Sequence, residues 1–431
     1  MNDLFEFILL RDLNVRVVVV GSMLLGAGSA AIGCFALLRK RALVGDAVAH
    51  AALPGVALAF MLFGNKDTGV LLLGATVTGW FGMIAMDRIV KWTKLSEDTT
   101  IGIVLSVLFG LGILLLTSIQ AGGNANQSGL DKFLFGQAAS MLASDVFIFG
   151  GICTLLIGCV IVFFKEFTLI SFDTEFATTV GLPMQLIEFI LTTLIVLSVV
   201  AGIQAVGVVL MAAMLITPGA AARYWTDRLR TMVLLSSLFG AMAGLGGAYV
   251  SYALPRMPTG PWIVTVATGI FAVSLLIAPR RGLLSRLYRR RANRRQTMQE
   301  NILKAMHRLS ERDGQRIAYR NEHDILAVRR MDPALLRRKL RSLRRDGFIE
   351  PGPDGGWRLT EEGVVAGERV TRLHRLWEVY LTEYVQIAAD HVHDDAESIE
   401  HVLTPELEVE LERLLNRPVT DPHKQSIPYG T

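Results

Sequence analysis

The chain has 431 residues, of which 52% are hydrophobic and 19% charged, and its formal net charge is +4. Long apolar runs dominate up to about residue 279, and Arg, Glu, Asp and His are frequent after it. Because several runs approach the ~20 residues needed to cross a bilayer, a soluble protein is excluded. All three cysteines lie inside apolar runs, which argues against disulfides and a zinc knuckle.

The apolar runs predict about nine transmembrane helices, with a range of eight to nine. They are expected at residues 15–38, 46–63, 69–90, 99–119, 144–164, 185–203, 205–222, 230–252 and 260–278. Several are rich in Gly and Ala, which lets helices pack closely in lipid. The stretch between Gln120 and Met141 leaves room for a re-entrant or interfacial helix.

Positive charges indicate the orientation, because cytoplasmic loops of membrane proteins are enriched in Lys and Arg. If the loop that contains Arg39, Lys40 and Arg41 is cytoplasmic, the loops on that side carry 18 Lys and Arg residues, against 5 on the other. We therefore expect a multi-pass protein of the plasma (inner) membrane with its N-terminus outside and its C-terminal region in the cytoplasm.

The C-terminal region shows the pattern of a winged helix-turn-helix. An amphipathic helix is expected from Gln296 to about Ser310, and a very basic helix over Asp332–Asp346. Two short strands around a Pro/Gly turn follow, from Phe348 on. Further helices are expected at residues 361–387, 394–401 and 405–415.

The predicted fold class is therefore an all-α polytopic membrane protein with a C-terminal cytoplasmic, mostly α winged helix-turn-helix domain. Its parts are a transmembrane domain, a basic juxtamembrane linker, the winged-helix domain and a last helical region. We place them at residues 1–280, 281–295, 296–364 and 365–431.

The second predicted span carries an acid and a histidine at helical spacing. Asp46 and His50 are four residues apart, so on a helix they share one face. Carboxylate and imidazole together suit Mn(II), Zn(II) or Fe(II), and Pro54 leaves the His50 carbonyl without its helical donor. The alternative is that Asp46 caps the helix start after Gly45 and that His50 only bonds a neighbour.

The run LVGDAVAHAALPGVALAF around this pair resembles the signature of manganese/zinc/iron-type metal-ion ABC importer permeases. FDTEFATTVGLP (Phe172–Pro183) and VVLMAAMLITPGAAAR (Val208–Arg223) are also typical of these subunits, and the resemblance covers residues 10–280. It implies that Asp46 and His50 handle the metal on its translocation pathway.

Phe172–Pro183 falls on the predicted cytoplasmic side and contains Asp173, Glu175 and Gly181. The resemblance implies a short amphipathic coupling helix that docks on an ATPase, and the alternative is a plain interhelical loop. Glu188 is a weaker ligand candidate, which we expect to be interfacial or paired with a neighbouring helix.

Seven of the eight histidines lie after residue 300. Acid and imidazole groups recur there at helical spacing, without cysteine, which suits Mn(II), Fe(II) or Zn(II). The candidate ligands are His374, Glu378, His393, Glu397, Glu400 and His401. The alternative is a solvated, charged helix face.

Residues 297–428 also resemble metal-dependent repressors of the diphtheria-toxin-repressor type, on the segments Arg358–Leu381 and Glu397–Pro428. The resemblance implies that the same six residues fall on metal-site positions, and that Glu397, rather than Cys, favours manganese. One departure is that Asn301 stands where the family supplies a further ligand, with Lys304 on the next turn.

The basic helix at Asp332–Asp346 has the charge to hold DNA phosphates. The same charges also suit anionic membrane lipid, and tethering to a membrane restricts access to DNA, so DNA is the less favoured partner.

The predicted function is that of a permease subunit, not an enzyme, which moves a divalent metal (manganese first, then zinc or iron) into the cytoplasm. The chain has no G-x-x-x-x-G-K-[ST] motif, so no nucleotide is expected to bind it. The resemblance implies a separate ABC ATPase subunit, a second permease copy or paralogue and an extracytoplasmic metal-binding protein. The rival is a membrane-anchored metal-responsive transcriptional regulator, and a channel or ion-gradient-driven carrier comes third.

Overall fold

The computed structural model describes residues 12–64, 67–121, 143–254, 257–352, 355–388 and 405–429. The chain forms two compact units, Met1–Arg286 and Leu287–Thr431. The first is the membrane unit and the second is the tail unit, and each is described by itself.

The membrane unit is all helical. Its helices are α2 (Leu13–Leu38), α3 (Val44–Phe63), α4 (Thr68–Trp92), α5 (Glu97–Ala121), α7 (Ala143–Val162), α8 (Phe164–Phe172), α9 (Thr174–Thr179), α10 (Met184–Val206), α11 (Val208–Trp225), α12 (Leu229–Ala253) and α13 (Thr259–Ile277).

Within the described residues, eight helices are long and apolar enough to cross a membrane, which confirms the lower end of the predicted range. They are α2, α3, α4, α5, α7, α10, α12 and α13. Helix α11, the expected seventh span, is not among them. The segment from 122 to 142, where a re-entrant helix was considered, lies outside the described residues.

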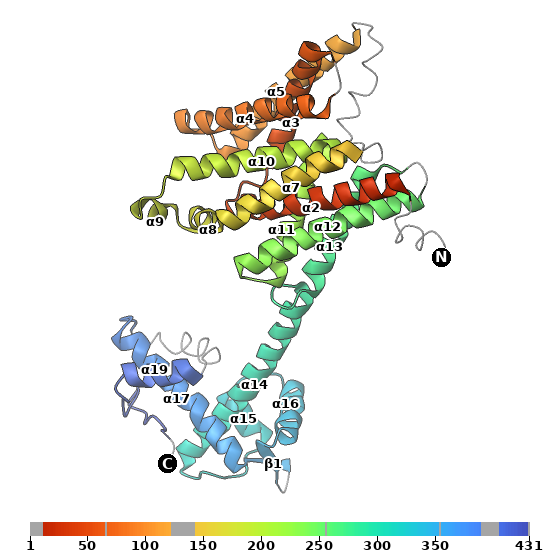
Figure 1. Ribbon diagram of the computed structural model, residues 1–431. Coiled ribbons are helices and arrows are strands. Elements are labelled where there is room, and N and C mark those ends of the chain that lie inside the picture. The colour runs from red at the N-terminus through yellow and green to blue at the C-terminus, as the bar shows by residue number, and fades with distance from the viewer. Residues whose placement is uncertain are drawn as a thin grey trace. The chain divides into compact units, whose positions relative to one another are not determined.

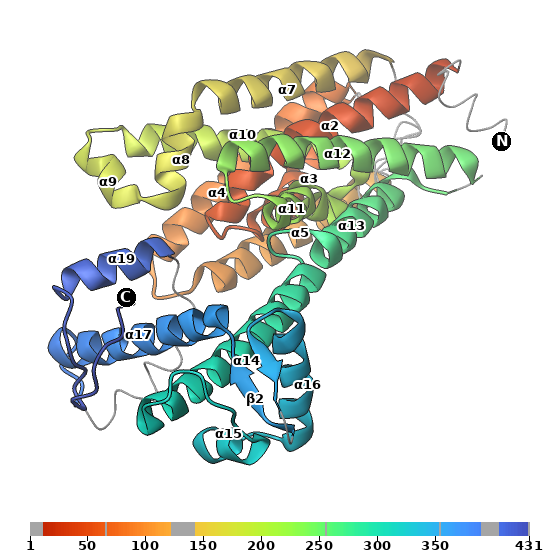
Figure 2. The ribbon, with the colours of Figure 1, turned by 90° about the horizontal axis from the view of Figure 1, so that it is seen from below.

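Helix α2 lies between α7 and α12 in the membrane unit (Figures 1 and 2). Glycine makes these contacts close: a Cβ on Gly26 would lie 2.3 Å from the Gly240 carbonyl oxygen of α12. On the same helix, a Cβ on Gly33 would lie 1.8 Å from the Leu215 carbonyl oxygen of α11. Only residues without a side chain allow backbones to approach in this way.

Helix α3 contacts four other helices of the unit, α4, α5, α10 and α11. A Cβ on Gly55 of α3 would lie 2.1 Å from the Gly74 carbonyl oxygen of α4. The helix continues through Pro54 without a break. The fold therefore places the candidate metal residues of α3 among neighbouring helices.

The tail unit confirms the predicted winged helix-turn-helix. Its helices are α14 (Leu283–Asp313, which begins just before the unit boundary), α15 (Glu322–Val328), α16 (Pro333–Arg345), α17 (Glu361–Glu383) and α19 (Pro405–Leu414). The wing is an antiparallel pair of strands, β1 (Ile349–Pro351) and β2 (Trp357–Leu359), in which Ile349 pairs with Leu359. Its core contains the fully buried side chains of Ile302, Ile325, Leu336 and Leu340.

One boundary in the tail differs from the prediction. Helix α14 begins at Leu283 instead of Gln296, because no Gly or Pro interrupts the Arg-rich run after Gly282 and Arg is a good helix former. The sequence assigned 281–295 to a linker, and most of that range is helix. The predicted helix at 394–401 lies outside the described residues.

Candidate metal sites

Asp46 and His50 lie one turn apart on α3. Asp46 Oδ1 is 3.5 Å from His50 Nε2, and the side chains are 36% and 13% exposed. The His50 ring packs edge-on against Phe109 of α5, with 4.7 Å between ring centroids. His50 Nδ1 is buried and has no hydrogen-bond partner within the described residues. The pair therefore places the Asp46 carboxylate beside Nε2 of the His50 ring, while the second ring nitrogen, Nδ1, has no partner among the described residues.

Asp46 is not the cap of α3, which rules out the capping alternative. The N-cap is Leu43, which makes no side-chain cap bond, and Asp46 lies in the first turn. A buried, unpartnered imidazole nitrogen is costly in a protein interior.

Some other acids of the membrane unit pair with arginines. Glu188 of α10 forms an ion pair with Arg39, which confirms the expected pairing with a neighbouring helix. Asp87 lies 3.5 Å from Arg41. Within the described residues, Asp46 lies beside His50 but pairs with no Lys or Arg.

The Phe172–Pro183 segment consists of the end of α8 and the short helix α9, and not of one amphipathic helix. Asp173 breaks the helix, because its Oδ1 accepts a hydrogen bond from the Phe176 N–H at 2.8 Å and caps α9. Glu175 lies exposed in the first turn of α9, and Gly181 follows the helix with a φ of +82°.

The sequence analysis missed the apolar side chains on this segment. Phe172, Phe176 and Val180 are 66%, 54% and 58% exposed. Phe172 ends α8, Phe176 lies on α9 and Val180 is the C-cap of α9, so apolar side chains are exposed on both sides of the break at Asp173. A regular apolar spacing in a segment rich in Thr was the signal that pointed to them.

In the tail, His374 and Glu378 form a buried pair on α17. His374 Nε2 lies 3.0 Å from Glu378 Oε1, and their side chains are 0% and 3% exposed. The other four predicted ligands, His393, Glu397, Glu400 and His401, lie outside the described residues.

Within the described part of the chain, no group of three or more His, Cys, Asp or Glu is placed to hold a metal. Of the six predicted ligands of the tail, the structure therefore describes one imidazole and one carboxylate, both on α17. Asn301 and Lys304, at the positions where the predicted site departs from the family, are both buried in α14.

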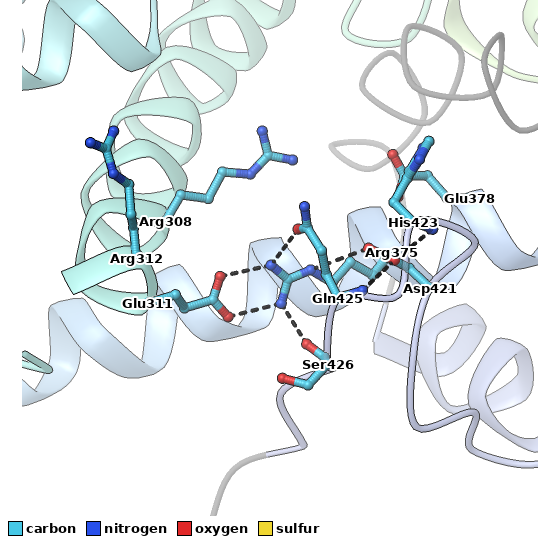
Figure 3. Close-up of a pocket in the computed structure, with 9 residues that line it drawn as sticks. All are labelled: Arg308, Glu311, Arg312, Arg375, Glu378, Asp421, His423, Gln425 and Ser426. Atoms are coloured by element: carbon cyan, nitrogen blue, oxygen red, sulfur yellow. Dashed lines mark hydrogen bonds and ion pairs between the residues drawn. The ribbon is translucent and has the colours of Figure 1, made fainter. Parts of the chain in front are cut away.

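A buried arginine next to His374 joins three parts of the tail (Figure 3). Arg375 of α17 binds Glu311 of α14 through both guanidinium Nη atoms, at 2.8 and 2.7 Å. Its Nη1 also donates to the Ser426 carbonyl at 2.6 Å, and its Nε lies 3.6 Å from Asp421 Oδ2. These groups line a cavity of about 770 Å³ that Glu378 borders.

The ionisation of Glu311 in this cluster depends on His307 and Arg375 beside it. Burial by itself raises the pKa of Glu311, but His307 and Arg375 beside it lower that pKa to about 2. His307 Nε2 lies 3.5 Å from Glu311 Oε1 without hydrogen-bond geometry, so Arg375 supplies the directional contacts. Glu311 is therefore ionised at neutral pH and holds α14 to α17.

Two family models match the chain. The ABC 3 transport family matches residues 12–278, and the metal binding and dimerisation domain of iron dependent repressors matches residues 360–429. The chain is 42% identical to the manganese transport system membrane protein MntC of Bacillus subtilis over 379 residues, which is 88% of this chain and 86% of that protein.

It is 47% identical to the zinc transport system membrane protein TroC of Treponema pallidum over 283 residues, 66% of this chain and 95% of that protein. Among solved structures, PsaBC from Streptococcus pneumoniae in complex with Fab matches with a TM-score of 0.58 and 34% identity. That match covers 64% of this chain and 97% of the other. The chain is therefore a multi-pass membrane protein that belongs to the ABC 3 transport family.

Proposed function

We propose that the chain is the permease subunit of an ATP-driven importer that moves a divalent transition metal into the cytoplasm. The observation that carries this proposal is the Asp46–His50 pair on α3, in which His50 Nε2 lies 3.5 Å from Asp46 Oδ1 and no Lys or Arg among the described residues pairs with Asp46. The names of the relatives MntC and TroC favour manganese and zinc as cargo, with iron third.

The two side chains supply one oxygen and one nitrogen donor. This set suits Mn(II), Zn(II) or Fe(II), while the absence of thiolate disfavours softer metals. Pro54 leaves the His50 carbonyl without a helical donor, which provides a further oxygen on the same helix. A few weak donors are what transport needs, because the cargo must leave the site as well as enter it.

The energy for transport is proposed to come from a separate ATPase subunit. The chain carries no phosphate-binding loop motif. The exposed Phe172, Phe176 and Val180 around α9 supply an apolar face for a groove on that subunit. Asp173 and Gly181 set the start and the end of this helix. A second permease copy or paralogue and an extracytoplasmic metal-binding protein complete the proposed complex.

For the tail we propose metal-dependent regulation of transport. The buried His374–Glu378 pair supplies a nitrogen and an oxygen donor for it, a combination that suits Mn(II), Fe(II) or Zn(II). His393, Glu397, Glu400 and His401 are the proposed further ligands. When metal is bound, it supplies a positive charge that draws these donors together.

Feedback of this kind requires reciprocal linkage: the tail must bind metal with different affinity in different transporter states. The test is a manganese titration of the tail in the resting complex and in the ATP-trapped complex. Equal affinities in the two states would remove the thermodynamic basis for feedback.

The rival function, a membrane-anchored transcriptional regulator, makes opposite predictions. The full chain would be expressed together with its candidate ATPase and purified in detergent. Our proposal predicts that the ATPase copurifies and that duplex DNA does not bind, with or without manganese. Metal-dependent DNA binding without any ATPase association would favour the regulator instead.

A further inference from the structure

A strongly basic cleft is lined by residues of α14 and α16 in the tail unit. Its volume is about 610 Å³. The charged residues that line it are all cationic: Arg291, Arg294, Arg295, Arg338, Lys339 and Arg345. Neither the candidate metal sites nor the proposed transport function makes use of this cleft.

The two walls of the cleft are bonded to each other. Arg295 Nη2 of α14 donates to Ser342 Oγ of α16 at 2.9 Å, and Lys339 Nζ of α16 donates to the Arg295 carbonyl at 3.3 Å. Gln299 Nε2 donates to Asp346 Oδ2 at 2.7 Å, just past the end of α16. These bonds fix α14 against α16 and hold Arg295 and Lys339 in place within the cleft.

The cleft carries charge without counterions. Within the described residues, none of its five arginines forms an ion pair with a carboxylate, whereas Arg337 on the same α16 bonds Glu322 at 2.8 Å. Lys339 is only 8% exposed, and burial, then Arg295 and Arg338, lower its pKa. Six like charges in one cleft repel one another, and a bound anion relieves this repulsion.

We propose that this cleft binds the phosphate of an anionic lipid headgroup at the cytoplasmic leaflet. Arginine suits a phosphate because its planar donors bind the oxygens in pairs. When its phosphate is bound in the cleft, the lipid holds the winged-helix domain at the membrane and neutralises the positive charges of α16.

The start of α14 favours a lipid over nucleic acid. Leu283, Leu284, Leu287 and Tyr288 are 43%, 57%, 50% and 76% exposed. Arg291 follows them about 12 Å along the helix from Leu283, at 1.5 Å per residue. Exposed apolar groups next to arginines are the pattern of a helix at a membrane interface. Duplex DNA matches the arginines but offers nothing to the apolar side chains.

The test uses the full-length protein in lipid nanodiscs and hydrogen–deuterium exchange. Discs of phosphatidylcholine alone are compared with discs that also contain phosphatidylglycerol. We expect peptides of α16 to exchange several-fold more slowly in the anionic discs. The double variant Arg338→Gln/Arg345→Gln should lose this difference, while Arg337→Gln, which removes the same type of charge outside the cleft, should keep it.

Unchanged exchange of α17 in the double variant would confirm that the tail remains folded. Equal exchange of α16 in both types of disc would refute the proposal, as would an equal loss in Arg337→Gln. Inorganic phosphate and duplex DNA are added separately to the phosphatidylcholine discs. If either protects α16 as well as phosphatidylglycerol does, the ligand is a free phosphate or a nucleic acid, and the lipid proposal is wrong.

Discussion

Replacement of Arg375 by Met should loosen the tail more than any surface substitution on the same helix. Arg375 is 3% exposed and faces Glu311, which is 31% exposed, and Asp421, which is 2% exposed. Removing one partner of a buried ion pair costs about 3–5 kcal/mol, because the other partner stays buried without compensation. Since Glu311 partly reaches water, we expect about 3 kcal/mol, near the lower limit.

Hydrogen exchange of the full-length protein measures this cost locally. A loss of about 3 kcal/mol corresponds to a roughly 100-fold increase in the opening equilibrium. Amides of α17 and of the Val419–Ile427 segment should therefore exchange roughly 100-fold faster in Arg375→Met. The matched control is Arg369→Met, because Arg369 lies on the same helix, is 45% exposed and pairs with Glu408. If the two variants exchange alike, the reasoning about the buried pair is wrong.

Three further predictions concern other contacts. The pKa of Glu311 is lowered to about 2 from its ordinary 4.5, so the stability that the ionised Glu311 contributes is complete above pH 4.5 and is lost as the pH falls towards 2. Glu311→Gln should therefore reduce the loss of near-ultraviolet circular dichroism over that range. An acid profile of the variant that is identical to that of wild type would contradict the assignment. Gly33→Val should prevent folding of the membrane unit, since even a Cβ would lie 1.8 Å from the Leu215 carbonyl oxygen. A normal monodisperse peak of this variant in size-exclusion chromatography would show that α2 and α11 are not so close. Phe176→Asp should leave folding intact, because Phe176 is 54% exposed, but should abolish copurification of the ATPase; retained binding would exclude this face as the docking surface.

Local patterns predicted most of the fold. Hydropathy located the spans, since the signal of a span lies within its own ~20 residues. The wing was visible because β-branched and aromatic residues surround a Pro/Gly turn. The Asp46–His50 pair could also be predicted, because a spacing of four residues places both side chains on one helix face.

Contacts between distant parts of the chain could not be predicted in the same way. Glu311, Arg375 and Asp421 belong to three separate segments, and only the folded tail brings them together. The α14–α16 cleft is hidden for the same reason, because its arginines look like an ordinary anchor and an ordinary basic helix in the sequence. The capping role of Asp173 was overlooked because the segment was treated as one helix.

The most direct test of the central claim is manganese accumulation in cells that lack their own importers and express this chain with its ATPase and delivery protein. Asp46→Asn is compared with wild type and with Asp87→Asn, whose carboxylate is similarly exposed but lies beside Arg41. Because Asp46 is a proposed ligand, its loss should lower saturable uptake by at least about tenfold, the smallest effect typical of residues that support a metal site. We predict this loss in Asp46→Asn and near wild-type uptake in Asp87→Asn. Uptake in Asp46→Asn that equals wild type would contradict the assignment of the Asp46–His50 pair to the metal pathway.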